Sequence, residues 1–257
     1  MATRTFESFL PRVLASVPGC PNATAEQHIK DTAIRVCERT LLWRHQPKVF
    51  NLLPGVYEYP YEKPDHADVH AVLGVHLNDS PLDVMTLEQA LRAHPKWADL
   101  YSGQDPSEVW GETPTGTFNG YAFNEAMFND EPTFTMPAAA VADGGEPLTF
   151  TQLTPDKFIV LPLPDATRPY RMRMFLALKP KRVATGMDEV MADELEDVII
   201  HGALQHLLTL PNTGWMDLEL AAYHAKQYLF AVTERRARAN LGNARATLRA
   251  QSQFFGV

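Results

Sequence analysis

The sequence predicts an α+β fold, with a helical bundle from both chain ends and an inserted antiparallel β-rich domain that is sandwich- or barrel-like. Near both ends, apolar residues recur at spacings of three and four, which is typical of helices. In the middle they alternate, which is typical of half-buried strands. The period changes at Pro47 and becomes helical again after Pro180. We therefore expect residues 1–46 and 183–257 to form the bundle, and residues 47–182 to form the inserted domain.

The N-terminal part predicts two helices. The first covers residues 6–17. The second begins with a capping box, in which Thr24 is the N-cap residue and Gln27 follows three positions later, and it runs to about Arg44. Cys37 lies on the apolar face of this second helix. Because the chain has two cysteines, we expect a reduced thiol in the core and no disulfide framework.

The middle of the chain predicts strands, with one short helix capped by Thr86. The turn residues Pro54 and Gly55 predict a hairpin between the first two strands. The expected strands cover residues 49–53, 56–59, 68–77, 148–153, 157–161 and 170–178, and the helix covers residues 85–93. Residues 95–145 lack a clear period and are expected to form an irregular insertion.

Two more helices are expected towards the C-terminus, separated by a turn that precedes Trp215. The first begins near Met187. Its Gly202 and Ala203 indicate a close contact with another helix, because a mid-helix glycine costs about 1 kcal/mol. The core face expected for the last helix consists of Leu218, Ala221, Ala222, Ala225, Leu229 and Val232. Beyond about Val232 this face thins out, so we expect an arginine-rich docking arm there.

Charge is distributed unevenly along the chain. The net charge is −8, but residues 234–257 carry five arginines and one acid, which leaves −12 for the rest. The arginines are Arg235, Arg236, Arg238, Arg245 and Arg249. This asymmetry indicates contact with something acidic, although a solvated helix face is the alternative. Phe254 and Phe255 favour a protein pocket over DNA as the partner of this segment.

The sequence contains none of the common phosphate-loop, dinucleotide, zinc-protease or nucleophile-elbow motifs. The nearest approach to a metal site is formed by Asp68, His70 and His76, which share one face of an expected strand. A metal-dependent hydrolase is therefore one alternative function. The other interpretation is a strand with polar residues on its solvated face. We expect no cofactor.

No apolar run reaches the roughly 18 residues of a membrane span, and the N-terminus has no signal-peptide core. We therefore expect no membrane association and a reducing cytosol as the place of synthesis.

Three segments together resemble the head-to-tail adaptor (connector) proteins of tailed bacteriophages, especially the ring proteins beneath the portal of short-tailed phages. The first is Phe9-Leu-Pro-Arg-Val-Leu with Pro21 and the helix ending Arg35-Val-Cys-Glu-Arg-Thr-Leu-Leu-Trp43. The second is Phe158-Ile-Val-Leu-Pro-Leu-Pro164 and the strand up to Pro180. The third is Glu196-Asp-Val-Ile-Ile-His-Gly-Ala-Leu-Gln-His-Leu-Leu208, followed by Trp215-Met-Asp217, Ala221 and Phe230. Residues 95–145 lie outside these segments.

The resemblance implies a structural virion protein without enzymatic activity, located in the neck of the particle. Such adaptors form rings, usually of twelve copies, that link the portal to tail, nozzle or tail-fibre proteins and surround the double-stranded DNA. In this chain, Gly202, Ala203 and Trp215 would serve helix packing and ring formation. The five arginines and Phe254 with Phe255 would contact the portal or DNA. A sequence-independent DNA-binding protein remains a further alternative.

Overall fold

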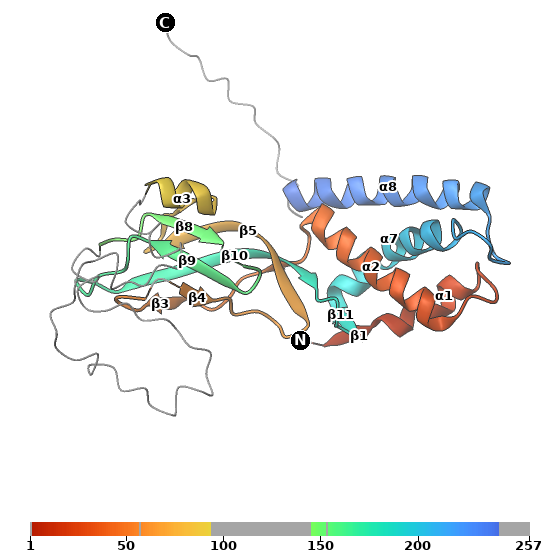
Figure 1. The fold of residues 1–257 in the computed structure, drawn as a ribbon, viewed down its shortest axis with the longest axis horizontal. Helices are drawn as coiled ribbons and strands as arrows, with labels where there is room; N and C mark the ends of the chain where they lie inside the picture. The colour runs from red at the N-terminus through yellow and green to blue at the C-terminus, as the bar shows by residue number, and fades with distance from the viewer. Residues whose placement is uncertain (1, 57, 94–144, 153, 242–257) are drawn as a thin grey trace, which may run out of the picture. The chain divides into compact units, whose positions relative to one another are not determined.

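The computed structural model describes residues 2–56, 58–93, 145–152 and 154–241 (Figure 1). These residues form helices and sheets, so the α+β prediction is confirmed. The chain divides into two compact units, Met1–Trp43 with Lys179–Val257 and Arg44–Leu178. The sequence had suggested boundaries at 46/47 and 182/183. We refer to the two parts as the helical unit and the β unit.

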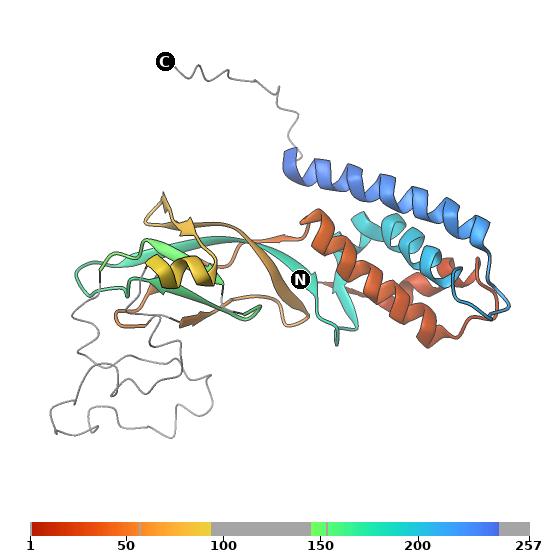
Figure 2. The same ribbon diagram turned by 45° about the horizontal axis from the view of Figure 1, so that its top comes forward.

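The helical unit joins elements from both ends of the chain. It contains the 3₁₀ helix η1 (Phe6–Phe9) and the helices α1 (Leu10–Leu14), α2 (Asn22–Thr40), α7 (Glu189–Leu207) and α8 (Leu218–Leu241). Its short strands β1 (Thr3–Thr5) and β11 (Gly186–Asp188) pair antiparallel. α7 packs against both α2 and α8, and Figures 1 and 2 show the three helices side by side.

The first two helices differ from the sequence prediction at their ends. The helix expected over residues 6–17 is divided into η1 and α1. The capping box at Thr24 is wrong, because α2 begins at Asn22, directly after Pro21. Proline has a φ fixed near the value that a helix entry needs, and its carbonyl accepts the N–H of Ala25 at 3.1 Å. Thr24 therefore lies inside the first turn.

The hydrophobic core of the helical unit surrounds α7. Its largest buried apolar side chains include Phe6, Phe9, Ile29, Leu195 and Ile199, which come from both chain ends. Cys37 is a free thiol with no exposed surface, and burial raises its pKa to about 12. This agrees with the reduced core thiol expected from the sequence.

The described residues of the β unit form two sheets. The larger one has the order β2 (Arg44–His45), β10 (Tyr170–Pro180), β5 (Ala67–Leu77) and β6 (Ser80–Pro81), with β3 (Phe50–Leu52) also paired to β10. The other has the order β4 (Glu58–Pro60), β9 (Lys157–Leu161), β8 (Thr149–Gln152) and β7 (Asp83–Val84). β7 and β8 run parallel, against the antiparallel expectation. An aromatic cluster joins the sheets, with Phe158 of β9 lying 6.3 Å from Phe50 of β3 and 5.0 Å from Phe150 of β8 between ring centroids.

The hairpin expected around Pro54 and Gly55 is wrong. β3 pairs with β10, whereas β4 pairs with β9 in the other sheet. The Tyr59 hydroxyl bonds the carbonyls of Leu53 at 3.0 Å and Val56 at 2.9 Å, which ties the turn to a side chain and not to a strand ladder. The hairpin of β8 and β9 is present as predicted, in the register Thr149 opposite Leu161.

The short helix α3 (Leu87–Ala93) has the predicted Thr86 cap. The Thr86 hydroxyl accepts the Gln89 N–H at 3.2 Å, and the Gln89 side chain accepts the Thr86 N–H at 3.1 Å. Across the ranges that the structure covers, no helix combines the length and the apolar composition of a membrane span.

Candidate interaction surface

The last helix, α8, begins at a side-chain cap. Asp217 accepts the backbone N–H groups of Glu219 at 3.0 Å and Leu220 at 2.9 Å through the same carboxylate oxygen. From this point the helix continues without interruption to Leu241. The start expected near Asp217 is therefore confirmed.

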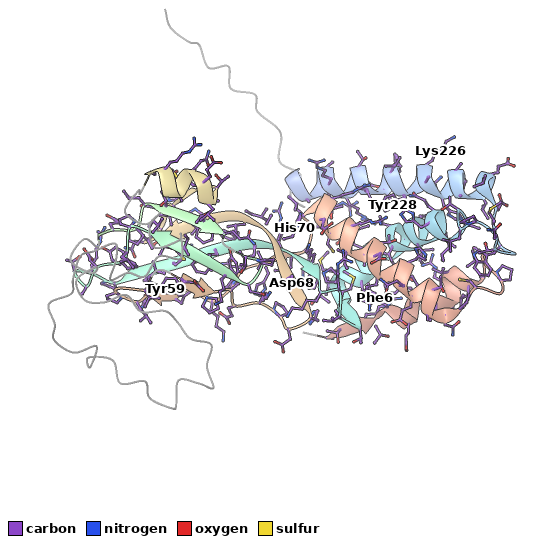
Figure 3. The ribbon with its side chains drawn as sticks, in the orientation of Figure 1. Phe6, Tyr59, Asp68, His70, Lys226 and Tyr228 are labelled. Carbon is purple, nitrogen blue, oxygen red and sulfur yellow. The ribbon has the colours of Figure 1, made fainter. Side chains whose placement is uncertain are left out.

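One side of α8 packs against the rest of the helical unit, and we call it the inner face. Its buried residues are spaced by three, four and seven positions, so they lie on one side of a helix. They are Ala221, His224, Tyr228, Val232 and Ala239. In Figure 3, Tyr228 points towards the neighbouring helices, whereas Lys226 points away from them.

Gly202 of α7 lies close to side chains of both α2 and α8. A Cβ atom added there would lie 2.5 Å from Cγ2 of Thr32 in α2 and 2.8 Å from Cδ2 of Tyr228 in α8. Any side chain at this position would force the side chain of Thr32 or Tyr228 to move. The neighbouring Ala203 is fully buried. Both residues therefore serve helix packing within a single chain.

The core face expected for α8 is partly wrong. Ala221 and Val232 are buried, but Leu218 and Leu229 have 62% and 57% of their surface exposed. Ala222 is also exposed. The cause is that His224 and Tyr228 occupy inward positions, each presenting an aromatic ring to the core. The inner face is thus rotated away from the face with the most aliphatic residues.

The opposite side of α8, its outer face, carries large apolar side chains that are exposed. Phe230 has 71% of its surface exposed and Tyr223 has 53%, and both share the outward half of the helix with Leu218 and Leu229. Single exposed apolar residues are ordinary on protein surfaces, but several on one helix face indicate an interaction site. The outer face is defined by Leu218, Ala222, Tyr223, Lys226, Leu229 and Phe230.

Two of the predicted contact arginines bind the chain's own body. Nη1 of Arg235 lies 3.4 Å and Nη1 of Arg238 3.3 Å from Oε1 of Glu194 in α7, and Arg238 also pairs with Glu234 at 3.1 Å. The docking arm therefore does not begin at about Val232, because Glu194 and the buried Ala239 keep this part of α8 packed.

Arg236 is the exposed member of the three arginines. It lines a hollow of about 420 Å³ together with residues of α8 and of the C-terminal end of α2, namely Glu38, Arg39, Leu41, Val232 and Thr233. Arg245, Arg249, Phe254 and Phe255 lie outside the described residues.

Trp215 lies in the connection between α7 and α8 and is half-buried. Its indole N–H is buried, and it has no acceptor in the part of the chain that the structure covers. We assign it no further role.

The predicted metal-site residues do not converge. Asp68 binds the ammonium group of Lys63 at 2.9 Å, and the His76 ring lies edge-on to Phe175 at 5.9 Å between centroids. Because a strand rises about 3.3 Å per residue, His76 lies about 20 Å from His70, although both belong to β5. Within residues 2–93 and 145–241, as far as described, no group of three potential ligands gathers. Sharing a strand face was not sufficient to form a site.

Sequence reasoning missed the contacts made by histidines. His201 of α7 and His224 of α8 are hydrogen-bonded through their Nδ1 atoms at 2.8 Å. His206 of α7 accepts from Nη1 of Arg35 in α2 at 2.7 Å through Nε2. The only available signal was that His201 and His206, five positions apart, point in different directions from one helix.

Comparison with known proteins adds no assignment. No protein-family model matches the sequence, and the search of curated proteins finds no match either.

Proposed function

We propose that this chain is a structural, non-enzymatic virion protein: an adaptor ring in the neck of a tailed bacteriophage. Copies of the chain would link the portal to tail, nozzle or tail-fibre proteins and would line part of the channel for double-stranded DNA. The helices from both chain ends would form the bundle of the ring. The observation that carries this proposal is the outer face of α8.

The outer face has the properties of a subunit contact. Its four large apolar side chains lie on a helix whose inner face fixes it firmly to α7, so the surface is preorganised. Aromatic residues such as Tyr223 and Phe230 are enriched in interfaces. A contact that uses two different patches of identical copies closes into a ring when the rotation between copies permits it.

A complementary patch exists at the start of α7. Val190 has 72% of its surface exposed, and the side chains of Asp193 and Asp197 next to it are 64% and 70% exposed, each paired with an arginine of the same chain, Arg4 at 2.7 Å and Arg12 at 3.0 Å. Lys226 and Arg236 on α8 are basic and exposed. Exposed apolar side chains thus favour contact between α8 of one copy and the start of α7 of the next copy, where Lys226 and Arg236 would share Asp193 and Asp197 with Arg4 and Arg12.

The C-terminal segment beyond α8 would carry the portal contact. Residues 242–257 contain Arg245, Arg249, Phe254 and Phe255. Deletion of residues 242–257 removes this segment without touching the packed helix. We expect the truncated protein to keep its melting temperature and to lose co-purification with the portal. Retained co-purification would contradict the portal assignment.

Ring formation is tested by particle mass and negative-stain images of the purified chain, alone and mixed with portal. We expect rings in at least one condition for the natural sequence. The double variant Leu229→Ser with Phe230→Ser should remain monomeric in both. The control Leu53→Ser with Val84→Ser changes two exposed apolar residues of the β unit and should assemble normally. Rings from the α8 variant, or monomers of the natural chain with portal, would overturn the proposal.

A further inference from the structure

Two histidine contacts hold α7 to its neighbours. The first joins α7 to α8, where Nδ1 of His201 and Nδ1 of His224 lie 2.8 Å apart. The second joins α7 to α2, where Nη1 of Arg35 lies 2.7 Å from Nε2 of His206. The ring of His28 in α2 stacks on His206 at 6.3 Å between centroids. The two contacts point from α7 towards different helices.

Each contact restricts the protonation of its imidazoles. A hydrogen bond between two ring nitrogens needs one N–H donor and one lone pair, so His201 and His224 cannot both be cations. Arginine only donates, so Nε2 of His206 must be the acceptor and that ring must be neutral. The geometry is thus compatible with at most one proton added to the three rings.

The surroundings reinforce this restriction. Burial lowers the pKa of His201 and His224, and the charge of His201 lowers that of His224 further. Around His201, Asp197 of α7 acts in the opposite direction, while Arg12 of α1 adds to the lowering of its pKa.

At the other contact, burial also lowers the pKa of His206 and of His28. Arg35, His28 and Arg39 lower the pKa of His206 further, and Asp31 opposes them. All three of these charged neighbours of His206, and Asp31, come from α2. Cationic groups therefore outnumber acidic ones around the ring.

We propose that these two contacts form a pH-sensitive device that holds α8 and α2 on α7 when the imidazoles are neutral and loosens both helices in mild acid. Release of α8 would expose its inner face, including Tyr228 and Val232. This inference does not depend on the proposed function, because it concerns contacts within one chain.

The sign follows from the lowered values. An unfolded histidine titrates near 6.5, above the folded value of these rings. Below that pH the unfolded state binds more protons, so stability is complete above about pH 6.5 and falls as the pH drops towards the folded values. The pKa of the Glu196 carboxyl is lowered by its hydrogen bonds with Arg4 and Arg12, so it titrates below this window.

The test uses the full chain with replacements that keep a hydrogen-bonding atom in place but do not titrate. Asparagine places its amide near the position of Nδ1, and glutamine near that of Nε2. For the natural chain we expect Tm to fall by roughly 4 °C between about pH 7.5 and about pH 5.5. The triple variant His201→Asn, His224→Asn, His206→Gln should lose most of this fall. His45→Asn, in β2 of the β unit, should retain it.

Amide hydrogen exchange of the natural chain provides a second measurement that needs no variant. After correction for the intrinsic pH dependence, we expect exchange in α8 and α2 to accelerate several-fold at the lower pH, with the β unit unchanged. An equal fall of Tm in the natural chain and the triple variant would overturn the proposal. So would acceleration confined to the β unit, or no change in either measurement.

Discussion

The inner face of α8 is more polar than its outer face, which is the reverse of what a helix on the surface of a protein usually shows. The inner face presents His224 and Tyr228, two rings with polar atoms, to the protein interior, whereas Leu229 and Phe230 face outward. A helix that only covered its own core would bury its most apolar side. The difference indicates that α8 packs through specific ring contacts on one side and has a second surface available for a partner on the other.

The largest expected effect comes from exchanging one aromatic residue on each face for alanine. Tyr228→Ala should lower the free energy of unfolding by about 3 kcal/mol, because a buried ring is removed and leaves a cavity next to Gly202. Phe230→Ala should change it by less than about 0.5 kcal/mol, since that ring is exposed. Urea denaturation measures both. Similar losses of unfolding free energy in the two variants would show that the inner and outer faces contribute equally to packing within the chain.

The positions of the helices in this unit could be predicted from the sequence, but the orientation of α8 could not. Periodicity located the helices to within a few residues, and Asp217 marked the start of α8. The orientation of α8 depends on where its aromatic rings find room. Gly202 of α7 leaves that room for the Tyr228 ring, and it lies in another part of the chain. A rule based on aliphatic residues therefore selected Leu218 and Leu229 for the core.

The β unit shows the same limit in another form. Alternation located β5 and β10, and the hairpin of β8 and β9, because each depends on local sequence. By contrast, β3 and β4 pair with strands that are distant in the sequence, and the Tyr59 hydroxyl bonds the turn between them. The turn residues at Pro54 therefore predicted a hairpin that does not form. The metal-site hypothesis failed for a related reason. His70 and His76 share a face of β5, but they lie six residues apart along the strand, too far to bind one ion.

A smaller effect is expected at the glycine that lets the inner face approach α7. Gly202→Ala places a methyl group 2.5 Å from Thr32 and 2.8 Å from Tyr228, so at least one side chain must move. We expect a net loss of about 1–2 kcal/mol, since overpacking outweighs the gain of about 1 kcal/mol in helix propensity. Gly214→Ala is the control, because its added methyl group meets no atom within 4 Å. If thermal unfolding ranks the two variants equally, the close contact at Gly202 does not contribute.

The smallest effect on stability is expected for Arg236 and Arg238, near the C-terminal end of α8. Arg238 pairs with Glu194 and Glu234, so Arg238→Gln should cost about 0.5 kcal/mol, the range of partly exposed ion pairs.

Arg236→Gln should leave stability unchanged within error, because the described residues provide Arg236 with no ion pair. Its effect should appear in assembly with a partner, where a basic residue beside the outer face meets an acidic surface. Denaturation curves measured at low and high salt separate the two cases, since added salt should weaken only the contribution of Arg238. If Arg236→Gln destabilises the isolated chain as much as Arg238→Gln does, then Arg236 contributes to packing within the chain and does not belong to a surface for a partner.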